Sequence, residues 1–130
     1  MNHAWIRAEL TAMLTDACAP ARVVDEEPDT VTDVTVVVAW TGSVRDRDVW
    51  RHSFEERIVL PAGDHATAHF ELRDRLVRAV AIAVDNWGPG PSYTTQRPAL
   101  SVDTVTVGTT PTPAVICRHT VTEPPEMGDP

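Results

Sequence analysis

The chain has 130 residues, of which 42% are hydrophobic and 23% are charged. This length and composition predict one globular domain with a hydrophobic core of its own. The formal net charge of −8 argues against a surface that grips nucleic acid, because phosphate binding needs a basic footprint. A protein that surrounds DNA without binding it is compatible with the same negative sign. No apolar run approaches roughly 18 residues, so we expect no transmembrane helix and no membrane partner.

The first expected element is a short helix from about residue 3 to residue 18. Its apolar residues recur at the three- and four-residue spacing of one helical face: Ile6, Leu10, Met13, Leu14 and Ala17. Asn2 is the candidate N-cap, and Pro20 ends the helix. The acidic segment at residues 25–30 lacks the Asp-x-Asp-x-Asp-Gly alternation of a calcium loop, so we interpret it as a solvated connector.

A β-hairpin is expected next, with strands at residues 34–40 and 49–60 joined by a loop at residues 41–48. Both faces of the first strand are apolar or small, which indicates either a central, well-covered strand or one buried in an assembly. His52 and Glu56 interrupt the apolar face of the second strand and are candidates to neighbour each other. The loop is either solvated or a specific contact loop, and its charges balance: Arg45, Asp46, Arg47 and Asp48.

The longest predicted element is a helix within residues 64–88, capped by Asp64 or Thr67 and closed by Gly88. One face of this helix is apolar: Leu72, Leu76, Val80, Ala83, Val84 and Trp87. On its wet face, acid–base pairs stand four residues apart in the order that stabilises a helix: Glu71 with Arg75, and Asp74 with Arg78.

A second hairpin is expected from strands at residues 100–107 and 114–122. Apolar residues change phase within the first of these strands, which predicts a β-bulge near Asp103 and Thr104.

The expected element order is therefore α-β-β-α-β-β. This order predicts an α+β fold, a two-layer sandwich with a mainly antiparallel sheet and both helices on one face. The single domain is expected to span residues 1–122, and a Pro- and acid-rich C-terminal tail to occupy residues 123–130.

His65 and His69 stand four residues apart, a spacing that puts two imidazoles on one helical face for zinc. The glutamate of the metalloprotease motif is missing, and a third ligand would have to come from Asp64 or His119. We therefore interpret the two histidines as exposed residues in the first turns of the helix.

Cys117 and His119 share one face of the last strand, as a thiol nucleophile and its base would. Strand cysteines are mostly core residues, so we expect Cys18 and Cys117 to be buried free thiols. No serine has the Gly-x-Ser-x-Gly frame of a nucleophile elbow. We predict no catalytic residue, no cofactor and no metal, and we expect that the protein is not an enzyme.

Four elements follow one another along most of the chain: a short helix, a hairpin with a charged tip, a long amphipathic helix ending in Trp-Gly, and a second hairpin. The stretches that carry this pattern are residues 5–17, 34–60 and 72–88. In element order, the chain resembles the tail terminator proteins (minor tail, or tail-completion, proteins) of long-tailed bacteriophages.

This resemblance implies a structural virion protein at the head-proximal end of the tail, assembled in the host cytoplasm. It implies a ring, usually a homohexamer, that caps the tail tube, ends tube polymerisation and joins the tail to the head connector. DNA would pass through the lumen without specific binding. The implied partners are further copies of the chain, the tail tube protein and the head–tail connector protein. The alternatives are a head-completion or neck protein at the adjacent joint and a small non-viral α+β binding domain.

Two charged surfaces are candidate subunit or partner contacts. The first is the hairpin loop with Arg45, Asp46, Arg47 and Asp48. The second is the polar face of the long helix with Arg73, Arg75 and Arg78. Guanidinium groups suit both surfaces because they form bidentate pairs with carboxylates.

Overall fold

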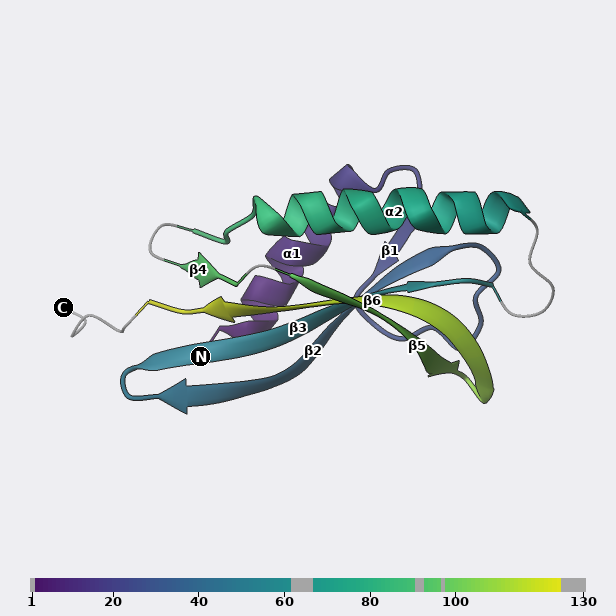
Figure 1. Cartoon of the computed structure of the whole chain (residues 1–130). Coiled ribbons are helices and arrows are strands. Elements are labelled where there is room, and N and C mark those ends of the chain that lie inside the picture. The colour runs from purple at the N-terminus through teal and green to yellow at the C-terminus, as the bar shows by residue number, and fades with distance from the viewer. Residues whose placement is uncertain (1, 62–66, 91–92, 97, 125–130) are drawn as a thin grey trace.

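The structure is a computed structural model that describes residues 2–61, 67–90, 93–96 and 98–124. Over these residues it contains two helices and a curled, mostly antiparallel sheet of six strands, so the α+β class is confirmed (Figure 1). The elements in chain order are α1 (His3–Ala17), β1 (Arg22–Val24), β2 (Thr35–Asp46), β3 (Val49–Val59), α2 (Thr67–Asp85), β4 (Thr94–Thr95), β5 (Ala99–Val107) and β6 (Thr110–Thr122).

The strands lie in the order β1-β2-β3-β6-β4, and β5 pairs with the part of β6 that β4 leaves open. The β1–β2 pair is parallel, and the other pairs within the described residues are antiparallel. The predicted order α-β-β-α-β-β is wrong because it omits β1 and β4. These strands have three and two residues, which is too short to show the alternation by which a strand is recognised.

The β2–β3 hairpin is longer than predicted. β2 extends to Asp46, so the turn that follows it is short. A register shift between Trp40 and Gly42 marks a β-bulge, and beyond it β2 continues to pair with β3. The prediction of a loop at residues 41–48 is wrong. A loop was expected because the small polar residues at the bulge have the composition of a turn.

β5 does not contain the bulge predicted near Asp103 and Thr104, because its register against β6 is continuous over the whole strand. The apolar residues change phase because those at the start of the strand lie on an exposed face and those at its end lie on the face that packs in the core. Val105 and Val107 pack in the core, whereas Val102 on the opposite face is 81% exposed.

Two apolar clusters form the core. The first combines one face of each helix with alternate residues of β2, β3 and β6: Ile6, Leu10, Leu14, Val36, Val38, Phe54, Ile58, Leu76, Val80, Val84, Cys117 and Val121. The second lies on the opposite face of β2 and includes Val31, Val37, Val59, Val107, Ala114 and Ile116. The first half of β2 is therefore covered on both faces by its own domain, and this interpretation of its apolar pattern is confirmed.

The first and last described segments of the chain meet. Asn2 is the N-cap residue of α1, as predicted, but its side chain makes no capping hydrogen bond. Its backbone N–H donates to Glu123 Oε1 at 2.6 Å. Glu123, expected in the tail, is 4% exposed, and its backbone N–H donates to the Trp50 carbonyl oxygen at 2.8 Å. Residues 125–130 of the predicted tail lie outside the described residues.

We predict that Gly108→Ala lowers the free energy of unfolding by about 1–3 kcal/mol. Gly108 lies in the β5–β6 turn at φ 61°, and an added Cβ would lie 2.7 Å from the backbone oxygen of Asp29. Chemical denaturation measures the change. Gly88→Ala is the matched control, because nothing lies within 4 Å of the Cβ position at Gly88. Equal losses in the two variants would contradict this explanation.

Candidate functional site

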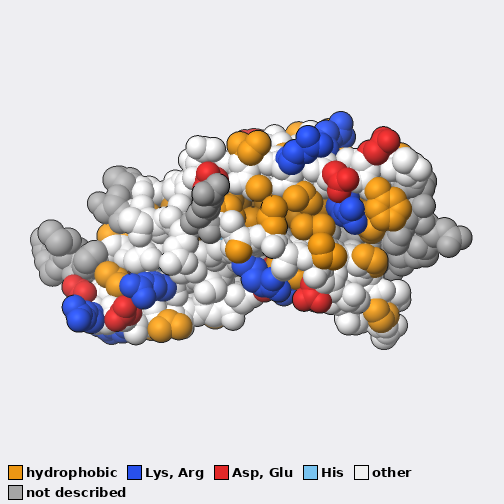
Figure 2. Space-filling model, in the orientation of Figure 1, with side chains coloured by type: hydrophobic (Ala, Val, Ile, Leu, Met, Phe, Trp, Pro, Cys, Tyr) orange, Lys and Arg blue, Asp and Glu red, His pale blue; other side chains and the backbone are white. Residues whose placement is uncertain are grey.

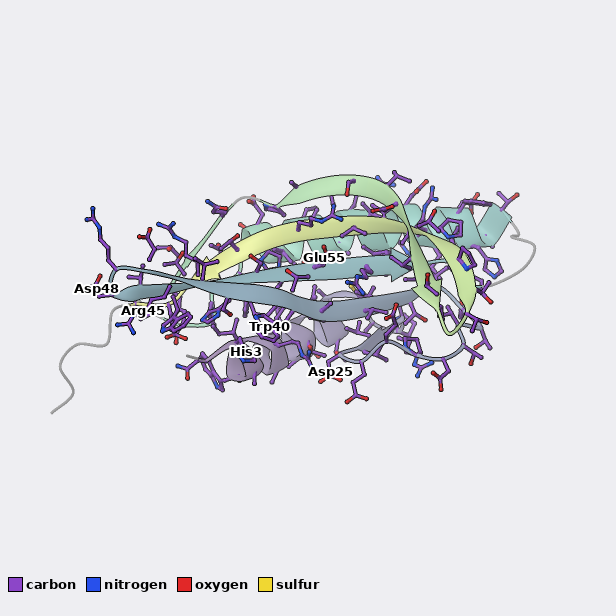
Figure 3. All side chains as sticks on the ribbon, turned by 90° about the horizontal axis from the view of Figure 1, so that it is seen from below. His3, Asp25, Trp40, Arg45, Asp48 and Glu55 are labelled. Carbon is purple, nitrogen blue, oxygen red and sulfur yellow. The ribbon has the colours of Figure 1, made fainter. Side chains whose placement is uncertain are left out.

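The tip of the β2–β3 hairpin is a two-stranded ribbon that projects from the sheet (Figure 3). β3 pairs with β6 only from Arg51 onward, so residues 44–50 have no third strand beside them in the described structure. Arg51 forms an ion pair with Asp46 at 3.0 Å, and Arg45 Nε donates to the Arg47 carbonyl oxygen at 3.1 Å. These contacts add to the backbone pairing of β2 with β3, which continues to Asp46 and Val49.

Of the four predicted contact residues at the tip, two support its shape and two are exposed at its end. Arg45 also lies over the Trp50 ring, with 6.0 Å between the guanidinium carbon and the ring centroid. Arg47 adopts φ 60°, which is uncommon for a residue other than glycine, and it is exposed together with Asp48. The hairpin therefore presents a preformed charged end.

On α2, the structure brings Arg75 and Arg78 together. Both are exposed, and neither forms a hydrogen bond or ion pair with the described part of the chain. They line a depression of about 610 Å³ together with Ala68, Glu71 and Leu72. Two unpaired guanidinium groups beside an apolar surface are suited to contact a carboxylate-bearing partner.

The ion pairs predicted along α2 are wrong. No salt bridge joins Glu71 to Arg75 or Asp74 to Arg78 among the described residues, and Asp74 instead pairs with its neighbour Arg73 at 3.1 Å. Exposed pairs at this spacing contribute only about 0.2–0.5 kcal/mol each, so a closer partner easily replaces them. The structure thus separates Arg73 from the other two predicted contact residues of the helix.

A chain of polar side chains lies at the base of the hairpin tip, on the side of the sheet that faces the helices. Trp40 Nε1 donates to Ser43 Oγ at 3.0 Å, Ser43 Oγ lies 2.6 Å from His52 Nδ1, and His52 Nε2 lies 3.0 Å from Glu123 Oε1. Because the indole N–H can only donate, the Ser43 hydroxyl is free to donate to His52. The imidazole N–H then faces the carboxylate. The β-bulge creates this arrangement because it places Ser43 directly opposite His52.

The first turn of α1 covers this polar chain. The His3 ring stacks on the Trp40 ring with 3.8 Å between centroids (Figure 3). Burial lowers the pKa of His3, and the nearby His52 and Arg7 lower it further, so these surroundings favour a neutral imidazole.

Ser43, His52 and Glu123 have the order of a nucleophile, a base and an acid, but their surroundings favour a structural role. A nucleophilic serine needs open space for substrate beside its hydroxyl group. Here the hydroxyl is hydrogen-bonded on both sides and the imidazole has no exposed surface. Neither Ser43 nor His52 lines the nearby depression of about 180 Å³, whose lining residues are Arg45, Asp48, Trp50, Glu123 and Pro124. The polar chain therefore ties the hairpin to α1 and to the end of β6.

Glu56 and His119 form a second buried polar contact, between β3 and β6. Glu56 Oε2 lies 2.7 Å from His119 Nε2, and neither side chain has exposed surface. Burial, together with the Glu56 carboxylate, raises the pKa of the Cys117 thiol to about 12. Such a thiol is a poor nucleophile, which argues against catalysis by Cys117 and His119. Cys18 and Cys117 are both buried and free, as predicted.

The sequence contained one signal for these two buried contacts. His52 and Glu56 interrupt the apolar alternation of β3, but they do not pair with each other. Their partners, Glu123 and His119, are 71 and 63 residues away along the chain. A local pattern shows that a buried polar residue needs a partner and does not show which residue supplies it.

No group of three or more metal-ligating side chains gathers within the described ranges. His65 lies outside those ranges, so the interpretation of His65 and His69 stays a prediction. No described helix is both long enough and apolar enough to cross a bilayer.

No family model matches this chain, and no curated protein matches its sequence.

We predict that His119→Leu lowers the free energy of unfolding by about 3–5 kcal/mol, because it leaves the buried Glu56 carboxylate without its partner. The double variant Glu56→Leu/His119→Leu is expected to recover much of this loss, since both polar groups are then removed. Urea unfolding, followed by tryptophan fluorescence, measures both variants. A double variant that is less stable than His119→Leu would contradict the assignment.

Proposed function

We propose that this chain is a structural virion protein and not an enzyme. In this proposal, copies of the chain form a ring that caps the phage tail tube and ends tube polymerisation. The ring joins the tail to the head connector, and DNA passes through its lumen. The two-layer sandwich with both helices on one face of the sheet belongs to the same proposal. It is supported by the single apolar cluster that both helices share with the sheet.

The observation that carries the proposal is the projecting, charged tip of the β2–β3 hairpin. The backbone pairing of β2 with β3 continues to Asp46 and Val49 and gives the ribbon its shape. The Asp46–Arg51 ion pair and the hydrogen bond from Arg45 to the Arg47 carbonyl oxygen add to it. A preformed ribbon loses little conformational entropy when it binds, so it is suited to contact a neighbouring protein. It is a convex feature, whereas substrate sites are concave.

The buried polar groups support a role without covalent chemistry. The two histidine–carboxylate contacts lie inside the domain. One joins β3 to β6, and the other joins β3 to Glu123, which also accepts a hydrogen bond at the start of α1. The thiol of Cys117, with its pKa raised to about 12, stays protonated at neutral pH. These groups contribute to a stable subunit.

The overall charge also supports the proposal. A net charge of −8 per chain would make the wall of a ring acidic on average. An acidic wall repels phosphate groups, so that DNA slides through the lumen without adhering to it.

We predict that the purified protein, added to polymerising tail tube protein from the same phage, limits tube length and forms a cap at one end of each tube. The cap would block the site where the next tube subunit adds. Negative-stain electron microscopy measures both the length distribution and the caps. Tubes that grow to the same length without caps would contradict the proposal.

The same experiment separates the two alternatives when the connector protein is included. A head-completion or neck protein would bind the connector and leave tube length unchanged. A small non-viral binding domain would bind neither the tube nor the connector.

We predict that Arg75→Glu/Arg78→Glu weakens ring assembly and leaves the monomer folded, because both side chains are exposed and have no partner within the described part of the subunit. Sedimentation velocity measures assembly, and circular dichroism checks the fold. Arg73→Glu is the matched control, because Arg73 lies apart from these two residues and pairs with Asp74. Intact rings at unchanged concentration would show that this face of α2 is only solvated.

A further inference from the structure

We infer that the free edge of β5, with an apolar patch beside it, receives the hairpin tip of a second copy of this chain. The patch consists of Ile82, Leu100 and Val102. This inference rests on the proposed ring, because it names one contact by which one subunit joins the next.

β5 has a free edge along its whole length. It pairs with β6 on one side, and no described strand pairs with its other side. A free edge presents unpaired N–H and C=O groups that can pair with another extended segment. Soluble proteins usually protect such edges with several charges, a proline or a bulge. β5 has nine residues, one charged side chain (Asp103), no proline and a continuous register.

The apolar patch lies directly beside this edge. Ile82 of α2 is 65% exposed, Leu100 is 50% exposed and Val102 is 81% exposed. Ile82 and Leu100 line a shallow depression of about 280 Å³ together with Ala81, Asp85 and Pro98. Figure 2 shows hydrophobic side chains gathered on this face of the molecule, between α2 and the strands below it. Large apolar side chains that gather at the surface mark a site where another protein binds.

The hairpin tip has the backbone and the side chain that this surface requires. It is an extended ribbon, and β1 covers the outer edge of β2 only as far as Val37. The outer edge of the tip is therefore open to a further strand within the described structure. Val44, on the tip, is 66% exposed. A ribbon aligned with β5 would continue the hydrogen bonds of the sheet and would bring Val44 to the apolar patch.

Charge complementarity selects the tip of the second copy as the occupant of the patch. Asp85 borders the depression and is exposed. Asp103 points to the opposite face of β5 from Leu100 and Val102 and pairs with Arg118 at 3.9 Å, so Asp85 is the acidic group beside the patch. The tip has an excess of positive charge: Arg45, Arg47 and Arg51 against Asp46 and Asp48. Two patches placed face to face would instead bring Asp85 against its own copy, and such a like-charge contact is unfavourable.

A contact between two different surfaces repeats from head to tail. Such a heterologous contact closes into a ring when the rotation between subunits fits, and every tip and every β5 edge is then occupied. The chain has both surfaces on one rigid sheet, because β2 and β5 are joined through β3 and β6.

Two variants test this inference by complementation. Leu100→Glu/Val102→Glu disables the patch, and Val44→Glu/Arg47→Glu disables the tip; all four side chains are exposed, so both variants are expected to fold. Ala12→Glu on the exposed side of α1 is the control substitution. Circular dichroism checks each fold, and Val102→Lys replaces the patch variant if the double substitution does not fold.

Sedimentation velocity is measured on purified protein without tail components. The unaltered chain and Ala12→Glu are expected to assemble. Each disabled variant alone is expected to sediment as a monomer of 14.2 kDa at the same concentration. An equimolar mixture is expected to form a species of two chains, because it contains one intact tip for each intact patch.

Three results would overturn the inference: an unaltered chain that is monomeric at every concentration, a disabled variant that assembles normally, or a mixture that stays monomeric. These results differ from a failure of the proposed function. A chain that assembles from tip to edge but never caps tail tubes would overturn the proposed function and keep this inference. Rings that persist in both variants would overturn this inference and keep the proposed function.

Discussion

The arrangement of the whole molecule depends on the pairing of β3 with β6, at whose centre Glu56 and His119 are buried together. This contact joins residues that are 63 positions apart in the chain. It also fixes the register of the two strands, because a slip of one residue would turn one partner to the other face and leave a buried polar group alone. Both helices pack on the same cluster of side chains. The hairpin tip and the free edge of β5 are therefore held in place relative to each other by this pair of strands.

Much of the fold could be predicted from the sequence because long, periodic segments carry strong signals. The two helices and the hairpin of β2 and β3 were expected near their observed positions, and the cover on both faces of β2 follows from its apolar residues. β1 and β4 could not be predicted because their pairing depends on neighbours and not on their own composition. The bulge after Trp40 was missed because Gly42 has the character of a turn residue, and only the pairing with β3 keeps it within a strand.

The candidate site was predicted as a set of charges, and the structure distinguishes among them. Arg75 and Arg78 line the same depression, whereas Arg73 forms an ion pair with Asp74. Which of these arginines pairs with Asp74 depends on side-chain geometry. The apolar patch was not predicted, because the change of phase of the apolar residues in β5 was interpreted as a β-bulge. In the structure the register is continuous: Leu100 and Val102 lie on an exposed face of β5, whereas Val105 and Val107 lie on the face that packs in the core.

The central claim is that the chain is a subunit whose hairpin tip and β5 edge build a ring. An image of the assembled protein by cryo-electron microscopy tests this claim most directly, because it shows which surfaces meet at each junction. We expect a closed ring in which the β2–β3 tip of every copy lies along β5 of the next copy, with the sheet continuous across the junction. A two-fold dimer joined through two β5 edges, or a ring whose hairpin tips touch no neighbour, would contradict it.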